Sequence, residues 1–412
     1  MNDFHYIGFD VHKKSIQFCM KLASGQIVEE GRLPATRAAL TAWAARQERP
    51  WKGALEATMF SAWIYDTLRP HAAELKVAHS ALLKAIAASK HASDRLDARK
   101  IADLVRVGWI PGVWMAPPEI RSLRLQLRYR NLVVRQATQV KNRIASTLME
   151  QGVEYTQSRL HGKKYFHALL ERLDEVPEPV RDLLRTSRGS LEMFACVQRL
   201  LLQRLSREKV LAERVRLLQT IPGVGPVTAL TWALEIGDPQ RFRSAAQAMS
   251  YCGLVAPLQE SAGKQFRQPL SKKRNGHLQR VLIEVAHLVA RDHPGLHVLY
   301  ERVKQQRHSG AAVIAVARKL VAYLLAVDKS RQPFELRTAA QAPDSPTGQT
   351  ASLPEPSIGA KKVARRSSPS RVRSADSAAA AGASAPWTAP GRRARGSTAM
   401  DGSDGTAARR SA

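Results

Sequence analysis

The chain has 412 residues, with 64 Lys and Arg against 35 Asp and Glu, which gives a formal net charge of +29. This excess favours a polyanionic partner, with nucleic acid ahead of an anionic membrane surface. Because 44% of the residues are hydrophobic, the chain can form real cores and is not a disordered basic tail throughout. The length predicts two or three domains.

The sequence does not show the patterns typical of a membrane span, a signal peptide or a disulfide framework. No stretch approaches the roughly 18 uninterrupted apolar residues of a membrane span, and the start MNDFHYIGFD lacks the layout of a signal peptide. We therefore expect a cytoplasmic protein with no membrane partner. Cys19, Cys196 and Cys252 lie far apart in apolar surroundings, which predicts three buried reduced thiols.

The first 115 residues alternate short β-like runs with helical patterns. Strands are expected over 4–9, 15–22, 26–31, 53–56 and 75–77, and helices over 36–46 and 61–68 and from about 80 and 93. Three strands followed by alternating helices and strands predict an α/β fold with helices on a mixed sheet.

The middle of the chain predicts long helices. From Pro118 to Gly152 an apolar stripe recurs at helical spacing while Arg and Lys crowd the remaining surface. A second long helix is expected from about Leu191 to Leu218. Such a pair predicts an antiparallel helical hairpin or an oligomerising coiled coil. The block 217–327 is expected to be mainly helical, with glycine-rich turns.

The composition changes sharply after Asp328. Residues 331–412 are dominated by Ala, Ser, Pro and Gly and carry 13 Lys and Arg against 6 Asp and Glu, a surplus of seven charges. Too few large apolar residues are present to offset the entropy of ordering, so we expect a disordered tail. The rest of the chain keeps +22 and is itself basic.

Four carboxylates of the α/β region form the first candidate site. Asp10 closes the first expected strand and Glu56 the fourth, while Asp94 and Asp97 are three residues apart at a helix start. Carboxyl ends of strands in open α/β sheets border the crevice where sites form. Acids gathered there would repel one another without cations, so the pattern predicts a two-metal magnesium site. For each acid alone, the alternative is a helix cap or a solvated charge.

Two further features lie in the C-terminal block. In IPGVGPV, Gly223 and Gly225 allow a sharp turn with exposed N–H groups, as in a helix-hairpin-helix that contacts nucleic-acid backbones; a plain helix–helix turn is the alternative. Ser261 and Ser271 lack hydrolase motifs around them, so composition alone predicts turn residues or phosphate contacts. The histidines, His12 among them, are scattered and predict core, loop or surface positions.

Taken together, the motifs match a known family. Asp10 in GFDVHKKS, Glu56 in LEAT, and Asp94 and Asp97 in SDRLDARKIADL are followed by IPGVGPVTAL, YCGLVAP, ESAGK, LSKK and AVARKL. In this order they resemble the DEDD-type transposases of bacterial insertion sequences, described as bridge-RNA-guided recombinases. The resemblance covers about residues 4–327 and leaves the tail out.

The resemblance implies a domain plan. It comprises a ribonuclease-H-like domain similar to junction resolvases over 1–115 and a helical stalk for oligomerisation and nucleic-acid binding over 116–216. A mainly α-helical transposase domain follows over 217–328, with the helix-hairpin-helix and the serine, and then the basic tail over 329–412.

The resemblance also implies chemistry. Asp10, Glu56, Asp94 and Asp97 would hold two Mg²⁺ ions, with Mn²⁺ as a substitute, and Ser261 would attack the DNA phosphodiester and become attached to it; Ser271 is the second choice. The nucleic-acid backbone would contact Gly223, Gly225, Lys272, Lys273 and Arg274. Donor and target DNA, a noncoding guide RNA and further copies of the chain, as a dimer or tetramer, would be the partners, in the bacterial cytoplasm and on the nucleoid.

One local departure and two alternatives remain. The family has Lys-x-Gly-Asn where this chain has Lys-Lys-Arg-Asn-Gly over 272–276, so the local turn differs. A metal-dependent junction-resolving nuclease would use the acids without a serine. A noncatalytic nucleic-acid-binding scaffold would use neither.

Overall fold

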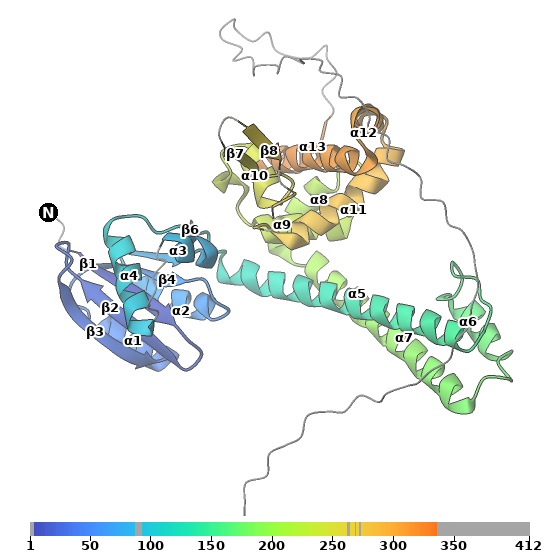
Figure 1. Cartoon of the computed structure of the whole chain (residues 1–412), viewed down its shortest axis with the longest axis horizontal. Coiled ribbons are helices and arrows are strands. Elements are labelled where there is room, and N and C mark those ends of the chain that lie inside the picture. Colours follow the sequence, from blue (N-terminus) through green and yellow to red (C-terminus); the bar gives the residue numbers. More distant parts are fainter. Residues whose placement is uncertain (1–3, 87–92, 262–263, 268, 272, 336–412) are drawn as a thin grey trace, which may run out of the picture. The chain divides into compact units, whose positions relative to one another are not determined.

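The computed structural model describes residues 4–86, 93–261, 264–267, 269–271 and 273–335 (Figure 1). The expected tail therefore lies almost entirely outside the described residues, and so does Lys272.

A six-stranded mixed sheet forms the N-terminal part, in the order β3-β2-β1-β4-β5-β6. Its strands are β1 His5–Val11, β2 Ser15–Lys21, β3 Ile27–Pro34, β4 Trp51–Glu56, β5 Glu74–Ala78 and β6 Gly112–Val113. Strand β1 pairs antiparallel with β2 and parallel with β4, which pairs parallel with β5. The predicted mixed α/β, ribonuclease-H-like architecture is confirmed, although β1 runs on to Val11, so that Asp10 lies inside the strand.

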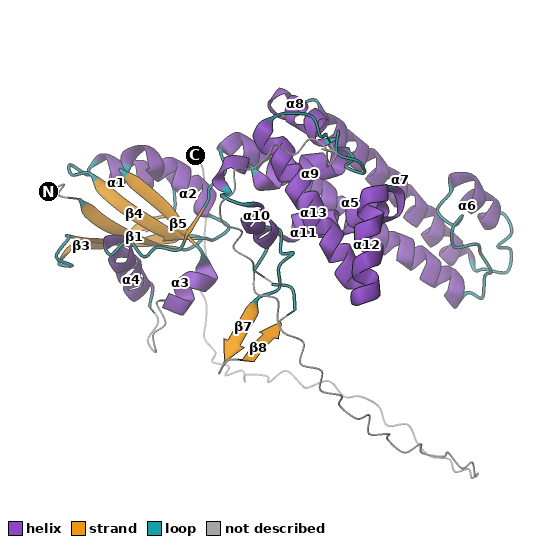
Figure 2. Ribbon diagram, turned by 90° about the horizontal axis from the view of Figure 1, so that it is seen from above, coloured by secondary structure: helices purple, strands orange, loops and turns teal. Residues whose placement is uncertain are grey.

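Helices cover both faces of this sheet (Figure 2). They are α1 Arg37–Ala45, α2 Ser61–Leu68, the short 3₁₀ turn Arg69–His71, α3 Ser80–Ile86 and α4 Asp94–Arg106. Because side chains alternate along a strand, Ile7 and Phe9 of β1 enter the core with α1 and α2, where Phe9 meets Trp43 edge to face. Gly8 lies on the other face, against α4.

Helix α4 is fixed to the sheet by ion pairs. Glu30 of β3, with a side chain only 8% exposed, accepts hydrogen bonds from Arg95 and Arg99 of α4. The bonds from Arg99, together with those from Arg95, outweigh burial and hold the pKa of Glu30 at about 2. Lys21 of β2 donates to Asp103 near the other end of α4 at 2.6 Å.

Two long helices follow, within the region 116–216 that was expected to form the stalk. Helix α5 Pro118–Glu150 packs along α7 Glu178–Ser206, with the short α6 Lys163–Leu170 between them in the chain (Figure 1). The expected helical hairpin is present, but its second helix begins earlier than predicted, because Pro179 suits the first turn of a helix. It also ends at Ser206, so the expected helix to Leu218 is two helices, not one.

The C-terminal part is mainly helical, as predicted. It contains α8 Lys209–Leu218, α9 Pro226–Ile236, the 3₁₀ turn Pro239–Arg241, α10 Ala245–Tyr251, a hairpin of β7 Leu258–Ser261 and β8 Lys264–Arg267, α11 Gly276–Asp292, α12 Pro294–Gln306 and α13 Ser309–Ser330. The hairpin was not expected. Helix α13 is long and apolar enough to cross a membrane by length and composition, but Val316, Leu320 and Leu324 are fully buried in the C-terminal core. We therefore interpret α13 as a core helix.

The cysteine expectation is partly wrong. Cys19 and Cys252 are buried, but Cys196 is exposed on α7. Burial raises the pKa of Cys252 to about 12, and burial together with a hydrogen bond to Glu30 does the same for Cys19. Cys196 follows an apolar run in sequence, yet it lies on the outer side of the helix.

We expect Glu30→Gln to lower the free energy of unfolding by about 1.5–3 kcal/mol at neutral pH, the usual range for hydrogen bonds to a charged group. Because the pKa of Glu30 falls from the ordinary 4.5 to about 2 on folding, this stabilisation is present above pH 4.5 and is lost as the pH falls toward 2. Urea unfolding of both proteins across that window should show the difference shrinking. The exposed Glu29→Gln is the control, and a difference independent of pH would contradict the assignment.

Thiol labelling tests the cysteine environments. Since the thiolate is the reactive form, a maleimide at neutral pH should label one thiol rapidly and two only on unfolding. Cys196→Ser should abolish the rapid phase, which mass spectrometry of the labelled peptide can follow. Rapid labelling of Cys19 or Cys252 in the folded protein would contradict their burial.

Candidate functional site

The sheet brings Asp10 and Glu56 to neighbouring strands at the same edge. Phe9 of β1 pairs with Leu55 of the parallel strand β4, so Asp10 and Glu56 each follow a paired residue. Phe9 and Leu55 both enter the core under α1 and α2. Alternation therefore turns Asp10 and Glu56 to the opposite face, the one that α4 covers.

Helix α4, which lies on this face, carries the other two acids, Asp94 and Asp97. It packs on β1, β2 and β4, and a Cβ at Gly8 would lie 2.2 Å from the carbonyl oxygen of Ala98. Ser93 is the N-cap of the helix, and its Oγ accepts from Leu96 N at 3.3 Å. Asp94 and Asp97 occupy the first turn, as predicted.

His12 joins two of the acids. Its Nε2 lies 3.0 Å from Asp10 Oδ2 and 3.3 Å from Asp94 Oδ1. Asp97 lies one turn along α4, and its Oδ1 accepts from Lys100 Nζ at 3.0 Å. Asp10, His12 and Asp94 can each offer a ligand atom within 4.8 Å of the others. The set fits a divalent cation, with carboxylates suited to Mg²⁺ and an imidazole that also suits Mn²⁺.

The electrostatics agree with a cation site. Burial raises the pKa of Asp10, which is 8% exposed; His12 lowers it, but the charges of Asp94 and Asp97 raise it again, and the net direction is upward. Asp97 is thus close enough to act on Asp10 although it lies outside the three-residue cluster. Glu56 is likewise outside that cluster and is placed beside it by the strand pairing.

Sequence reasoning did not single out His12. It treated the histidines as scattered, but the spacing Asp10-Val11-His12 was a usable signal. Residues two apart along a strand share a face. Because His12 directly follows β1, this spacing places it on the same side of the sheet as Asp10.

The two candidate serines belong to the C-terminal part. Ser261 ends β7 and pairs with Lys264 across the hairpin turn. Ser271 Oγ accepts from Lys273 N at 3.1 Å, and Arg274 donates to Ser271 O at 2.6 Å. Lys273 and Arg274 are exposed.

The glycine turn lies between α8 and α9. Gly223 has a φ of +78°, and a Cβ there would lie 2.0 Å from Val289 Cγ2 of α11, so both the backbone and the packing require glycine. Gly225 precedes Pro226, the first residue of α9, and has open space around its Cα. The predicted sharp glycine turn between two helices is present, and the helix-hairpin-helix assignment and backbone contact by these glycines stay predictions.

Comparison with known proteins gives two family matches. A family described as "Transposase", of the DEDD type, matches residues 7–151, which include all four acids. A second, described as "Transposase IS116/IS110/IS902 family", matches residues 215–301, which include the glycine turn and both serines.

Curated relatives agree with these matches. The transposase for insertion sequence element IS1111A of Coxiella burnetii is 29% identical over 209 residues, 48% of this chain and 55% of its own length. That for element IS1328 of Yersinia enterocolitica is 28% identical over 169 residues, 39% of this chain and 47% of its own length. The pilin gene-inverting protein of Moraxella bovis is 32% identical over 131 residues, 31% of this chain and 40% of its own length.

The matched part thus spans about half the length of these curated relatives. The order of the strands in the sheet, the acidic cluster and both family matches nevertheless support the same assignment. The chain belongs to the IS110-family transposases, with a DEDD-type N-terminal domain and a C-terminal transposase domain.

Proposed function

We propose that the protein is a DNA recombinase of an insertion sequence that cuts and rejoins strands through a covalent serine–DNA intermediate. The observation that carries the proposal is the cluster of Asp10, His12 and Asp94 at the edge of the sheet, next to Glu56 and Asp97. A basic nucleic-acid-binding chain has no other evident use for acids gathered at one edge.

The four acids are assigned to the metal site. Asp10 and Asp94 would hold a divalent cation directly, with Glu56 and Asp97 completing a two-ion site, and His12 would orient Asp10 or add a nitrogen ligand. When bound, Mg²⁺ supplies positive charge that stabilises the negative charge developing on phosphate and leaving oxygen.

Ser261 is assigned as the nucleophile, with Ser271 as second choice. Its Oγ forms a bond to phosphorus while the bond from phosphorus to a sugar oxygen breaks; the serine proton leaves with a base and the sugar oxygen ends as a hydroxyl. A sugar hydroxyl of another strand then reverses the step and frees the serine. Because each broken ester bond is replaced by another, strand exchange needs no ATP.

The domain plan, sequence choice and assembly are proposed by analogy with the family. We assign 1–115 to catalysis by metal, 116–216 to oligomerisation and nucleic-acid binding, 217–328 to serine chemistry and backbone contact, and 329–412 to loose attraction of nucleic acid. Base pairing with a noncoding RNA would choose donor and target DNA, while the protein holds backbone and shape. Gly223, Gly225, Lys272, Lys273 and Arg274 are the proposed backbone contacts.

Exposed apolar side chains of the stalk support a homo-oligomer. Leu125 and Tyr129 of α5 are 70% and 54% exposed, and Met193 of α7 is 57% exposed. These two exposed positions of α5 are four apart and so share one face of the helix. A second copy that covers this face could bring a serine to the acids of its partner.

The test of the function is a protein–DNA adduct that survives denaturation. Incubation with Mg²⁺, element RNA and substrate DNA should yield such an adduct in the wild type and none in Ser261→Ala, with Ser271→Ala as the matched comparison. Asp10→Asn should slow its formation about 10³-fold, in line with the several kcal/mol that a metal site contributes.

Each alternative has its own outcome in that experiment. Cleavage that survives both serine substitutions but is lost in Asp10→Asn would replace the recombinase with a metal-dependent nuclease. Binding without cleavage or adduct would leave the noncatalytic scaffold. Adduct formation without the RNA would remove RNA guidance alone.

Metal binding can be measured without turnover. We expect titration calorimetry with Mn²⁺ to show binding that Asp10→Asn nearly abolishes and His12→Asn weakens about 10-fold, the usual loss for a group that orients a ligand. Lys13→Gln, next to His12 in the chain, is the control and should have little effect. Equal Mn²⁺ affinity in the wild type and His12→Asn would exclude His12 from the site.

A further inference from the structure

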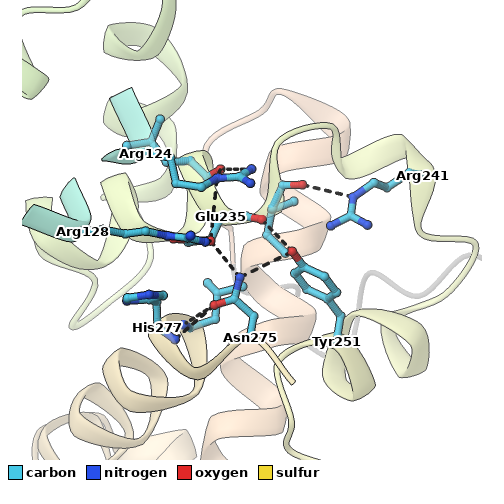
Figure 3. Close-up of polar contacts among 10 residues, drawn as sticks. Arg124, Arg128, Glu235, Arg241, Tyr251, Asn275 and His277 are labelled. Carbon is cyan, nitrogen blue, oxygen red and sulfur yellow. Dashed lines mark hydrogen bonds and ion pairs between the residues drawn. The ribbon is translucent and has the colours of Figure 1, made fainter. Parts of the chain in front are cut away.

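Glu235, near the end of α9, is a buried carboxylate outside the acidic cluster. Its side chain is fully buried, and both its oxygens accept from Arg128 of α5 at 2.8 Å (Figure 3). Arg124, one turn earlier on α5, lies 3.7 Å from it and also donates to Leu234 O at 2.8 and 3.0 Å. Two arginines of the stalk therefore bind the end of α9.

Asn275 joins the same carboxylate from the other side. Its Oδ1 accepts from the backbone N–H groups of His277 and Leu278, which makes it the N-cap of α11. This use of the oxygen leaves the amide Nδ2 as a donor, and it donates to Glu235 Oε2 at 2.8 Å. The capping role and the contact with Glu235 thus fix one orientation of the side chain.

These contacts enclose the segment that carries both candidate serines, Val255–Arg274, which we call the serine segment. Just before it, Tyr251 donates its hydroxyl to Glu235 O at 3.1 Å, and Tyr251 O accepts from Asn275 N at 3.0 Å. Gly253 O accepts from Gln279 and Leu254 O from Arg318. Both ends of the serine segment are therefore held together at Glu235.

The charge of Glu235 is stabilised by its partners. Burial alone raises the pKa of Glu235, but the hydrogen bonds from Arg128 and Asn275 and the charges of Arg128 and Arg124 outweigh it, so that the pKa lies below its ordinary value. Apolar residues often stabilise a core at least as well as a buried ion pair does. The ionised pair of Glu235 and Arg128 adds a fixed geometry, because each carboxylate oxygen accepts from a particular nitrogen of Arg128.

We propose that the contact Arg128–Glu235–Asn275 is a positioning device that sets the serine segment in register with helix α5 of the stalk. The inference rests on the proposed function, because that function gives one of the enclosed serines a chemical role. It holds for either serine, since both lie between the anchored ends. Glu235, Arg128 and Asn275 are positioning residues and do not touch the reacting atoms.

The same core contains a matched control pair. Arg214 of α8 binds Asp328 of α13 through two contacts of 2.6 Å, and Asp328 also accepts from Trp232 Nε1 at 2.8 Å. Asp328 is buried like Glu235, at 7% exposure, but its partners lie away from the serine segment in the chain. Loss of either pair should cost similar stability, whereas only loss of the Glu235 contacts should disturb the segment.

The first experiment measures the order of the segment without DNA. At a temperature where all variants are folded, trypsin should cut after Lys273 or Arg274 about 10-fold faster in Glu235→Leu and Arg128→Met than in the wild type, which corresponds to about 1.4 kcal/mol. Amide hydrogen exchange over 253–279 should rise in parallel. Asp328→Asn and Arg214→Met should leave both within about 2-fold of the wild type.

A polarity swap tests the contact itself. Asn275→Asp alone sets two carboxylates against each other and should be the most disturbed variant. Combined with Glu235→Gln, it restores the bond between positions 235 and 275, because the Gln amide nitrogen can donate to Asp at position 275 while the Gln oxygen keeps one of the two bonds from Arg128. The double variant should therefore be cut by trypsin more slowly than Asn275→Asp alone.

The second experiment measures chemistry. Glu235→Leu should form the serine adduct about 10–100-fold more slowly at saturating DNA while its DNA affinity changes less than about 3-fold, and the polarity swap should form it faster than Asn275→Asp alone. Unchanged trypsin cleavage and exchange in Glu235→Leu, or equal changes in Asp328→Asn, would overturn the inference. Absence of any adduct in the wild type would overturn the proposed function, and the experiment without DNA would still decide the positioning role.

Discussion

The close contact between α4 and β1 is the constraint on which the acidic cluster depends. Gly8 leaves no space for a side chain between the strand and Ala98 of the helix. Glu30 then holds Arg95 and Arg99 of the same helix. With α4 at this distance and rotation, the first turn that carries Asp94 cannot avoid the side of the sheet to which Asp10 points.

Among the described residues, buried carboxylates have two kinds of surroundings. Glu235 and Asp328 are each bound by arginine through two hydrogen bonds, so their charge is neutralised in place. Asp10 is also buried, at 8% exposure, but it has a half-exposed histidine and two further acids for neighbours, and its pKa is raised. A carboxylate that is buried and left short of positive charge suits a cation, whereas one paired with arginine suits a fixed contact between elements.

Much of this could be predicted from the sequence, and the limits have physical causes. Alternation with a period of two predicted five strands along the chain and a mixed α/β fold, and the Asp94–Asp97 spacing predicted a shared helix face. The start of α7 was missed because Leu191 begins the apolar stripe, while Pro179 marks the helix earlier. The β7–β8 hairpin was missed because its strands are only four residues each and carry no alternating apolar pattern.

Contacts between distant segments were the least predictable. His12 could have been placed beside Asp10 from local spacing, but its approach to Asp94 depends on how α4 packs. Glu235 was not singled out in the sequence, since 40 positions separate it from Asn275 and 107 positions separate it from Arg128. No local pattern reports such a contact, because burial of the carboxylate arises only when α5, α9 and α11 meet.

Helix α5 is connected both to the sheet domain and to the core that holds the serine segment. It follows the sheet domain directly in the chain, beginning at Pro118 only five residues after β6 ends at Val113. Through Arg124 and Arg128 it also binds Glu235, and hence both ends of the serine segment. The candidate metal-binding acids and the candidate nucleophiles lie in different parts of the chain, and α5 connects these parts, because it follows the sheet domain and binds Glu235. If the proposed positioning role holds, a displacement of α5 by nucleic acid or by another subunit would move both anchored ends of the serine segment together.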